Sequence, residues 1–430
     1  MKEWNVAVIG LGFIGLPLSL SYAMKGANVI GLDINETLIT EINSGHSHHL
    51  EYYEGKSLQD ILQEQLKAER FRATSSYEEM AEQVDNYIIT VGVDVKNGDP
   101  QLANLQSAME QLSKVLKKGD TVLLRSTVVP GTTEELVKPI LEQNGLTAGE
   151  DFYLGYSSER IAEGRAFEEF RTMPLAAGGM NPESLQKVKE LLQVVTEVAI
   201  HETEIKVVET AKIIENVQRD VNIAMVQEFA RFAERTGMDT YELMKTANTH
   251  TRVNLLTPGP GVGGYCLPNA LYYLLPKAAE HGLDLPLLRK AREINDGIPL
   301  HVVEEVINSL QEKGKLVKEA KVAVLGLAMK DFSNDDRISP PHDIVNLFLE
   351  KGLKVAAYDP AVPNSYSYKV NSLKEAIQDA DALVYLTVQE EFVELNWDEI
   401  ISKMKEDAVV YDAKNRVPLR IRDKATLIRM

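Results

Sequence analysis

The sequence contains a single cysteine, Cys266, and no apolar stretch of the roughly 18 residues that a membrane-spanning helix needs. One cysteine excludes an intrachain disulfide framework and suits a reducing compartment. The N-terminal "MKEWNVAVIG" enters a strand at once, without the separate apolar segment and cleavage site of a signal peptide. We therefore expect a cytoplasmic protein.

Basic residues are scarce relative to acidic ones. There are 46 Lys and Arg against 64 Asp and Glu, which gives a formal net charge of −18. This excess argues against nucleic acid or an anionic membrane as the main partner. An anionic ligand must then be held by individual arginines and lysines. The 44% hydrophobic content is that of a globular protein, and 430 residues suffice for two or three domains.

The N-terminal segment predicts a dinucleotide-binding turn. Residues 6–9 form a continuous apolar run, typical of a strand buried on both faces. A G-x-G-x-x-G pattern follows, and Asp33 ends the next strand at the expected offset. The glycines let the backbone approach a pyrophosphate, while the Asp33 carboxylate accepts from ribose hydroxyls and repels a 2′-phosphate. We predict that NAD is bound by Gly10, Gly12, Phe13, Ile14, Gly15 and Asp33.

The rest of the chain predicts two further parts. From residue 203 the pattern becomes helical, with a long 3.6-residue apolar periodicity that Gly237 ends. "AKVAVLGLAMK", "LKVAAYDP" and "ADALVYLTV" then predict a second parallel sheet, whose first turn lacks the full glycine pattern. The predicted class is α/β. Two Rossmann-like doubly wound domains, residues 1–202 and 301–430, are joined by a long central helix within a helical dimerisation region, residues 203–300.

Several motifs together resemble the UDP-glucose/GDP-mannose dehydrogenase family over essentially the whole chain. They are "GLGFIGLPL", "STVVPGTT" (126–133), "SSERIAEGRA" (157–166), "ETAKIIENVQRDVNIA" (209–224), "GPGVGGYC" and "DDRISP" (335–340). The resemblance implies that C6 of a nucleotide sugar is oxidised from alcohol to carboxylate with two NAD, by a homodimer whose C-terminal domain binds the UDP-sugar. The segments "RDVNIA" and "PGPGVGG" resemble the UDP-N-acetylhexosamine branch, whose products feed polysaccharide biosynthesis.

The resemblance assigns catalysis to five residues. Cys266 matches the thiol that captures the aldehyde as a thiohemiacetal and then carries the thioester. Lys212 and Asn216, four apart on the predicted helix, match the pair that stabilises oxyanions at C6. Glu159 matches the base for thioester hydrolysis. Thr127 matches a threonine that positions water, and we also expect it to contact the cofactor.

The resemblance also implies the substrate site. We expect Arg252 and Arg337 to bind the diphosphate, because a guanidinium grips phosphate with paired donors. Arg252 resembles an arginine that reaches the neighbouring subunit's site. The expected UDP-sugar ligands are Glu159, Arg160, Lys212, Asn216, Arg252, Gly263, Lys330, Arg337 and Lys414.

The "HSHH" segment invites a metal interpretation. It contributes His46, His48 and His49 on a polar stretch, but their spacing fits no standard zinc pattern. We expect a solvated loop and no metal.

Departures from the family pattern leave alternatives open. Ala270 stands where the family usually has aspartate, and Ala cannot relay protons. "VGVDV" (91–95) replaces V-P-T-P, and Lys414 in "DAKN" replaces an arginine. The alternatives are a UDP-glucose 6-dehydrogenase, an enzyme that is slowed or stops at the aldehyde or thioester, and a non-catalytic nucleotide-sugar sensor or partner subunit. A fourth is another two-domain NAD-dependent hydroxyacid dehydrogenase, which needs no cysteine.

Overall fold

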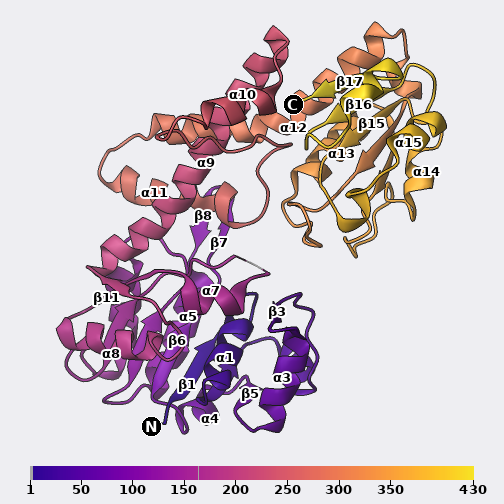
Figure 1. Ribbon diagram of the computed structural model, residues 1–430. Helices are drawn as coiled ribbons and strands as arrows, with labels where there is room; N and C mark the ends of the chain where they lie inside the picture. The colour runs from indigo at the N-terminus through magenta and orange to yellow at the C-terminus, as the bar shows by residue number, and fades with distance from the viewer. Residues whose placement is uncertain (1–2, 163) are drawn as a thin grey trace. The chain divides into compact units, whose positions relative to one another are not determined.

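The computed structural model describes residues 3–162 and 164–430, which form two compact units (Figure 1). The first unit comprises Met1–Glu215 and Tyr272–Leu283, and the second comprises Asn216–Leu271 and Asp284–Met430. Within the described ranges, no helix is long and apolar enough to cross a membrane.

An eight-stranded sheet forms the centre of the first unit. All neighbouring strands are parallel except the antiparallel pair β10 and β11. The order from β5 to β10 is that of a doubly wound dinucleotide-binding sheet. In spatial order the strands are β12 (Ile200–Glu202), β11 (Leu175–Gly179), β10 (Tyr153–Tyr156), β9 (Thr121–Leu124), β6 (Asn86–Ile89), β1 (Asn5–Ile9), β2 (Asn28–Leu32) and β5 (Phe71–Thr74).

Helices and two short hairpins surround this sheet. Helix α1 is buried from Gly15 to Ala23, because its sequence is apolar on all sides. The hairpins are β3 (Tyr52–Tyr53) with β4 (Lys56–Ser57), and β7 (Asp94–Lys96) with β8 (Asp99–Gln101). The α-helices are α1 (Gly15–Met24), α2 (Glu36–Asn43), α3 (Leu58–Lys67), α4 (Tyr77–Ala81), α5 (Ala103–Val115), α6 (Lys138–Leu141), α7 (Ala166–Thr172) and α8 (Pro182–Leu192).

The long helix predicted from the apolar periodicity is confirmed as α9 (Ile205–Thr236), with 32 residues. It ends before Gly237, whose φ of +73° favours glycine. In the second unit, a buried ion pair ties α9 to α12. Asp220 accepts from Arg292 Nη1 at 2.6 Å and from Asn295 Nδ2 at 2.9 Å. The other helices of this region are α10 (Thr240–Ala247), α11 (Cys266–Glu280) and α12 (Pro286–Glu312).

A five-stranded parallel sheet forms the remainder of the second unit, as the apolar runs predicted. Its strands are fully buried at the centre, and the sheet separates two apolar clusters. The strands in spatial order are β14 (Lys354–Tyr358), β13 (Lys321–Leu325), β15 (Ala382–Tyr385), β16 (Val409–Asp412) and β17 (Thr426–Arg429), and the helices are α13 (Pro340–Glu350), α14 (Leu373–Ile377) and α15 (Trp397–Lys403).

The first turn of this second sheet differs from a dinucleotide turn. Gly326 has a φ of +91° and packs against Thr387, as a nucleotide-binding glycine would pack against the neighbouring strand end. However, Asp359, at the end of the second strand, is 2% exposed. Its carboxylate accepts from the backbone N–H groups of Leu327 (2.7 Å) and Ala328 (3.1 Å), among others. No acidic oxygen is left there for a ribose.

Candidate active site

The glycine-rich turn of the first unit is shaped for a pyrophosphate. A Cβ at Gly15 would lie 1.7 Å from the Gly10 carbonyl oxygen, and a Cβ at Gly10 would lie 3.0 Å from the Thr90 carbonyl group. Gly10 also has a φ of +99°. A Cβ at Gly12 would meet no atom within 4 Å, so this side of the turn is open. Gly10 and Gly15 thus allow close packing, whereas Gly12 leaves space for a ligand.

The carboxylate expected at the ribose position supports the same turn. Asp33 Oδ2 accepts from the backbone N–H of Leu11 at 2.8 Å, and Oδ1 accepts from Asn35 at 3.0 Å. Thr90 Oγ1 donates to the Gly10 carbonyl at 2.7 Å. Asp33 remains partly exposed, and each carboxylate oxygen keeps a lone pair for a hydroxyl. These residues fit NAD, and Phe13 and Ile14 complete the turn between the second and third glycines.

A buried glutamate, Glu209, joins the "STVVPGTT" loop to α9. Its carboxylate accepts from the backbone N–H of Gly131 (2.5 Å), the backbone N–H of Thr133 (2.9 Å) and the Thr133 hydroxyl (2.6 Å). Burial raises the pKa of Glu209, while these donors lower it. Lys212 lies three residues further along the helix, so one hydrogen-bonded cluster fixes the Thr127 loop against the segment that carries Lys212. Sequence reasoning missed Glu209, although it opens the "ETAKIIEN" motif.

The predicted base, Glu159, is held in a second buried cluster. It forms an ion pair with Arg125, which is 4% exposed, and accepts from the backbone N–H groups of Arg160 (2.7 Å) and Ile161 (3.0 Å). The cation and the two N–H donors fix the position of this carboxylate. The Arg160 guanidinium itself pairs with Glu215 at 2.5 Å and donates to the Pro174 carbonyl at 2.9 Å.

Lys212 and Asn216 are both partly buried on α9. The i, i+4 spacing places them on one face of the helix, as predicted. Lys212 forms no ion pair with any residue in the described ranges. An ammonium group and an amide on one helix face can therefore both donate to an oxygen of a ligand.

Cys266 is exposed and is the first residue of α11. The glycine loop before it is closely packed. Gly264 N donates to the Ile338 carbonyl at 3.0 Å. A Cβ at Gly263 would lie 2.8 Å from Pro340 Cδ. The "GPGVGG" and "DDRISP" motifs therefore pack on each other, and this contact fixes where α11 begins.

The second unit contains a cavity of about 490 Å³ at the carboxyl ends of its strands. Open α/β sheets bind ligands at this edge. Lys330 and Lys414, both predicted from the sequence, line the cavity, as do Arg219 and Arg416, which sequence reasoning missed. Lys414 pairs with Asp331 at 2.9 Å. In the described part of the chain, the guanidinium groups of Arg219 and Arg416 have no acidic partner, which leaves two cations for an anionic ligand.

A buried carboxylate shapes one wall of this cavity. Asp412 ends β16 and is fully buried. It accepts from the backbone N–H groups of Lys414 (3.0 Å), Arg416 (3.2 Å) and Val417 (2.8 Å). Burial raises the pKa of Asp412, and the three donors oppose this effect. The turn that presents Lys414 and Arg416 is thereby fixed.

The two arginines predicted for the diphosphate do not line this cavity. Arg337 forms a bidentate ion pair with Asp335, at 2.9 Å and 2.6 Å. Arg252 is exposed on the loop after α10, where its backbone N–H donates to His250 Nδ1 at 3.3 Å. Ala270 is 3% exposed.

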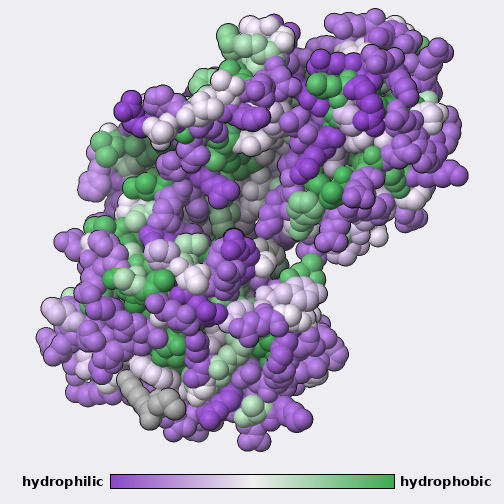
Figure 2. All heavy atoms as spheres, viewed as in Figure 1, coloured by the Kyte–Doolittle hydropathy of each residue, from purple (hydrophilic) through white to green (hydrophobic). Residues whose placement is uncertain are grey.

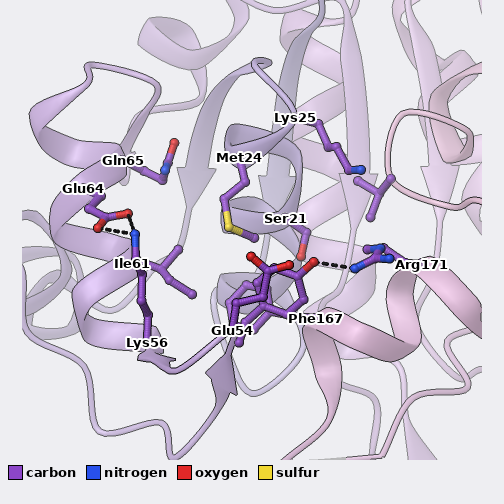
Figure 3. A pocket seen from close by; sticks show the side chains of 12 residues that line it. Ser21, Met24, Lys25, Glu54, Lys56, Ile61, Glu64, Gln65, Phe167 and Arg171 are labelled. Carbon is purple, nitrogen blue, oxygen red and sulfur yellow. Dashed lines mark hydrogen bonds and ion pairs between the residues drawn. The ribbon is translucent and has the colours of Figure 1, made fainter.

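A separate cavity of about 400 Å³ lies at the far end of α1 from the glycine turn (Figure 3). Its cations already have acidic partners. Lys56 pairs with Glu64 at 2.6 Å, and Lys25 and Arg171 both pair with Glu197 at 3.1 Å. We assign no anion site there. Within the described ranges, no group of three or more His, Cys, Asp or Glu side chains is arranged to hold a metal ion.

A glycine turn open on one side, with a carboxylate at the ribose position, defines the first unit as that of an NAD-dependent oxidoreductase. The chain belongs to the UDP-glucose/GDP-mannose dehydrogenase family. The family's NAD binding domain matches residues 4–196, its central domain residues 206–297, and its UDP binding domain residues 323–418. The predicted family, fold class, cofactor and enzyme class are thereby confirmed.

Similar proteins include dehydrogenases that act on N-acetylated sugars. UDP-N-acetyl-D-mannosamine dehydrogenase of Pyrococcus horikoshii is 35% identical over 411 residues, which are 96% of this chain and 95% of that protein. UDP-N-acetyl-D-glucosamine 6-dehydrogenase of Pseudomonas aeruginosa is 33% identical over 421 residues, 96% of this chain and 97% of that protein. The structure of the Pyrococcus horikoshii UDP-D-ManNAc dehydrogenase matches with a TM-score of 0.91 and 34% identity over 98% of both chains.

The Glu209 cluster can be tested by substitution. In the wild type, the backbone N–H groups of Gly131 and Thr133 donate to the Glu209 carboxylate. Glu209→Gln replaces one of the two carboxylate oxygens by an amide NH₂, which cannot accept a hydrogen bond. We expect it to lower the free energy of unfolding by about 1–3 kcal/mol, measured by urea denaturation. Glu228→Gln, at an exposed position of the same helix, is the control and should change stability by less than about 0.5 kcal/mol. A Glu209→Gln protein as stable as the wild type would mean that Glu209 is protonated and the interpretation is wrong.

Proposed function

We propose that this protein oxidises the C6 alcohol of a UDP-N-acetylhexosamine to a carboxylate, in the cytoplasm, as a step of polysaccharide biosynthesis. The observation that carries the proposal is Cys266, an exposed thiol at the start of a helix, fixed by a closely packed glycine loop. The sugars named for the Pyrococcus and Pseudomonas relatives support the N-acetylhexosamine assignment. A hydroxyacid dehydrogenase has no use for such a thiol.

The proposed mechanism assigns a distinct task to each side chain. The residues of the glycine turn and Asp33 would hold NAD, which would supply a hydride acceptor for each of the two oxidations, one NAD molecule per oxidation. The Lys212 ammonium and the Asn216 amide donate to the C6 oxygen and stabilise its negative charge. The Cys266 thiolate adds to the aldehyde carbon, and after the second oxidation the sulfur is part of a thioester. Glu159 takes a proton from the water that hydrolyses the thioester, and Thr127 orients that water.

One observation favours a second candidate, in which the oxidation is slowed or stops early. Ala270, four residues after Cys266, presents a methyl group where the family pattern has a carboxylate. The side chain is buried, so bulk water does not replace the missing acid at this position. In this candidate the cysteine still traps the aldehyde, but the proton transfers that complete the reaction are slow.

The yield of NADH per sugar distinguishes the two candidates. The purified protein is incubated with UDP-GlcNAc, UDP-ManNAc, UDP-GalNAc and UDP-glucose, and NADH absorbance is compared with sugar consumed. We expect two NADH per sugar with an N-acetylhexosamine substrate, and at most one with Cys266→Ser, because a hydroxyl is a much weaker nucleophile than a thiolate. Two NADH with UDP-glucose alone would contradict the substrate assignment. One NADH on every sugar would support the arrested enzyme.

The nucleotide part of the substrate is proposed to bind in the 490 Å³ cavity of the second unit. Arg219, Arg416, Lys330 and Lys414 supply positive charge there, and paired guanidinium donors match phosphate oxygens. Arg160, Arg252, Gly263 and Arg337 remain proposed ligands on the strength of the family pattern. Arg337 must first leave Asp335 to serve as one.

Affinity for UDP alone tests this placement. Arg219→Gln and Arg416→Gln each remove a cation with no acidic partner, so we expect UDP to bind roughly 10- to 100-fold more weakly by calorimetry. Arg231→Gln, at an exposed position of α9 outside the cavity lining, is the matched control and should bind UDP as the wild type does. Unchanged affinity in both cavity variants would place the diphosphate elsewhere.

We further propose that the protein is a homodimer that pairs through α9. Most of the visible surface is hydrophilic (Figure 2). Yet α9 exposes apolar side chains at Val207, Ile214, Met225, Phe229 and Phe232, the last of them 59% exposed. At 3.6 residues per turn these positions fall on one stripe along the helix. Such a stripe is matched by the same stripe of a second copy. In this proposal residues 203–300 are the dimerisation part between residues 1–202 and 301–430.

Phe232→Glu tests the dimer. A charge within an apolar interface is costly, so we expect this variant to elute as a monomer while the wild type has twice that mass by light scattering. Glu228→Gln, exposed on the same helix, should leave the mass unchanged. A wild-type protein that is monomeric at micromolar concentration would refute the proposal.

A further inference from the structure

The histidine-rich segment after α2 packs on the glycine-rich turn. His49 is 8% exposed, so the expectation of a solvated loop is wrong for this residue. Its ring lies 5.4 Å from the ring of Phe13, between the second and third glycines, and stacks on His48 at 4.9 Å. The His48 ring is 6.3 Å from Phe13. The three rings therefore form one aromatic cluster that includes a residue of the turn.

The His49 ring is neutral and has an unused polar atom. Burial and, to a smaller extent, the nearby His48 lower the pKa of His49 to about 4. The Ser47 hydroxyl lies 2.9 Å from Nδ1 and also accepts from the His49 backbone N–H at 3.3 Å. With the hydroxyl donating to Nδ1, the single ring hydrogen is on Nε2.

The His49 ring lies next to the backbone of Gly12. The Gly12 backbone is close enough to favour a proton on the ring. Nevertheless, Nε2 is buried and has no partner of hydrogen-bonding geometry among the described residues. Buried donors rarely lack a hydrogen-bond acceptor. A buried donor without an acceptor next to a ligand-binding turn therefore indicates a hydrogen bond that forms when the ligand binds. The Gly12 carbonyl accepts one hydrogen bond, from the backbone N–H of Leu16 at 3.3 Å, and so has a second lone pair for another donor.

We propose that His49 is a positioning residue for the cofactor. Its Nε2–H donates to the Gly12 carbonyl when the turn closes on the pyrophosphate, and the peptide N–H groups of the turn are thereby held toward the phosphate oxygens. The stacked His48 ring and the edge-on Phe13 ring keep the imidazole in place. The inference rests on NAD binding and is independent of which sugar the enzyme oxidises.

Four variants separate the hydrogen bond from the shape of the ring. The side-chain amide nitrogen of His49→Gln lies about as far from the backbone as Nε2 of histidine. The amide nitrogen of His49→Asn lies only about as far from the backbone as Nδ1. His49→Phe keeps an aromatic ring without a donor. His46→Ala, in the same segment but exposed, is the control. NADH affinity is measured by fluorescence titration without sugar, and UDP affinity by calorimetry reports on the second unit.

We expect His49→Phe and His49→Asn to bind NADH roughly three- to tenfold more weakly, the effect of one hydrogen bond. His49→Gln should stay within about twofold of the wild type, and His46→Ala and all UDP affinities should be unchanged. Wild-type NADH affinity in His49→Phe would overturn the proposal, as would equal losses in His49→Gln and His49→Asn. Because both amide variants have similar size and polarity, their comparison holds even if His49→Phe folds poorly.

Discussion

The buried Glu209 carboxylate is the constraint on which the arrangement of the first unit's proposed catalytic groups depends. A carboxylate without solvent is costly unless donors surround it, and here all three come from one short stretch, Gly131 to Thr133. The loop that carries Thr127 therefore cannot move away from α9 without exposing an unpaired charge to the core. Since Lys212 lies three residues from Glu209 on the same helix, the hydrogen bonds of Glu209 also fix the position of Lys212 relative to the loop. The Arg125–Glu159 ion pair fixes the neighbouring strand end in the same way.

The two sheets use one design for different tasks. Each first strand ends in a glycine of positive φ packed against a threonine, Thr90 in one sheet and Thr387 in the other. What differs is how the acidic residue after the second strand is used. Asp33 accepts from two N–H groups and stays partly exposed, so it can still bind a ribose, whereas Asp359 is buried and occupied by backbone donors. Burial of one carboxylate thus converts a dinucleotide turn into a structural one, and the second sheet presents its strand ends to a nucleotide instead.

Features that depend on neighbours in sequence could be predicted. The buried strands, the glycine turn with Asp33, the length of α9 and the common face of Lys212 and Asn216 all follow from local periodicity or spacing. Contacts between distant segments could not, because they depend on which strands become neighbours. Arg125 and Glu159 are 34 positions apart, and Gly131 and Glu209 are 78 apart. The packing of the "GPGVGG" loop on Pro340 could not be predicted either, since glycines that permit flexibility equally permit close contact.

In this acidic chain, cations and hydrogen-bond donors without a protein partner distinguish proposed binding sites from structural clusters. At the far end of α1, Lys25 and Arg171 share Glu197, so the protein itself supplies their counter-charge. Arg219 and Arg416 line the cavity of the second unit but have no acidic partner in the described part of the chain. With 64 acidic residues available, two unpaired guanidinium groups in one cavity are not explained by a shortage of carboxylates. We propose that a bound ligand supplies their counter-charge, and the buried Nε2 of His49 follows the same reasoning for a hydrogen bond, which in this proposal forms when the cofactor binds.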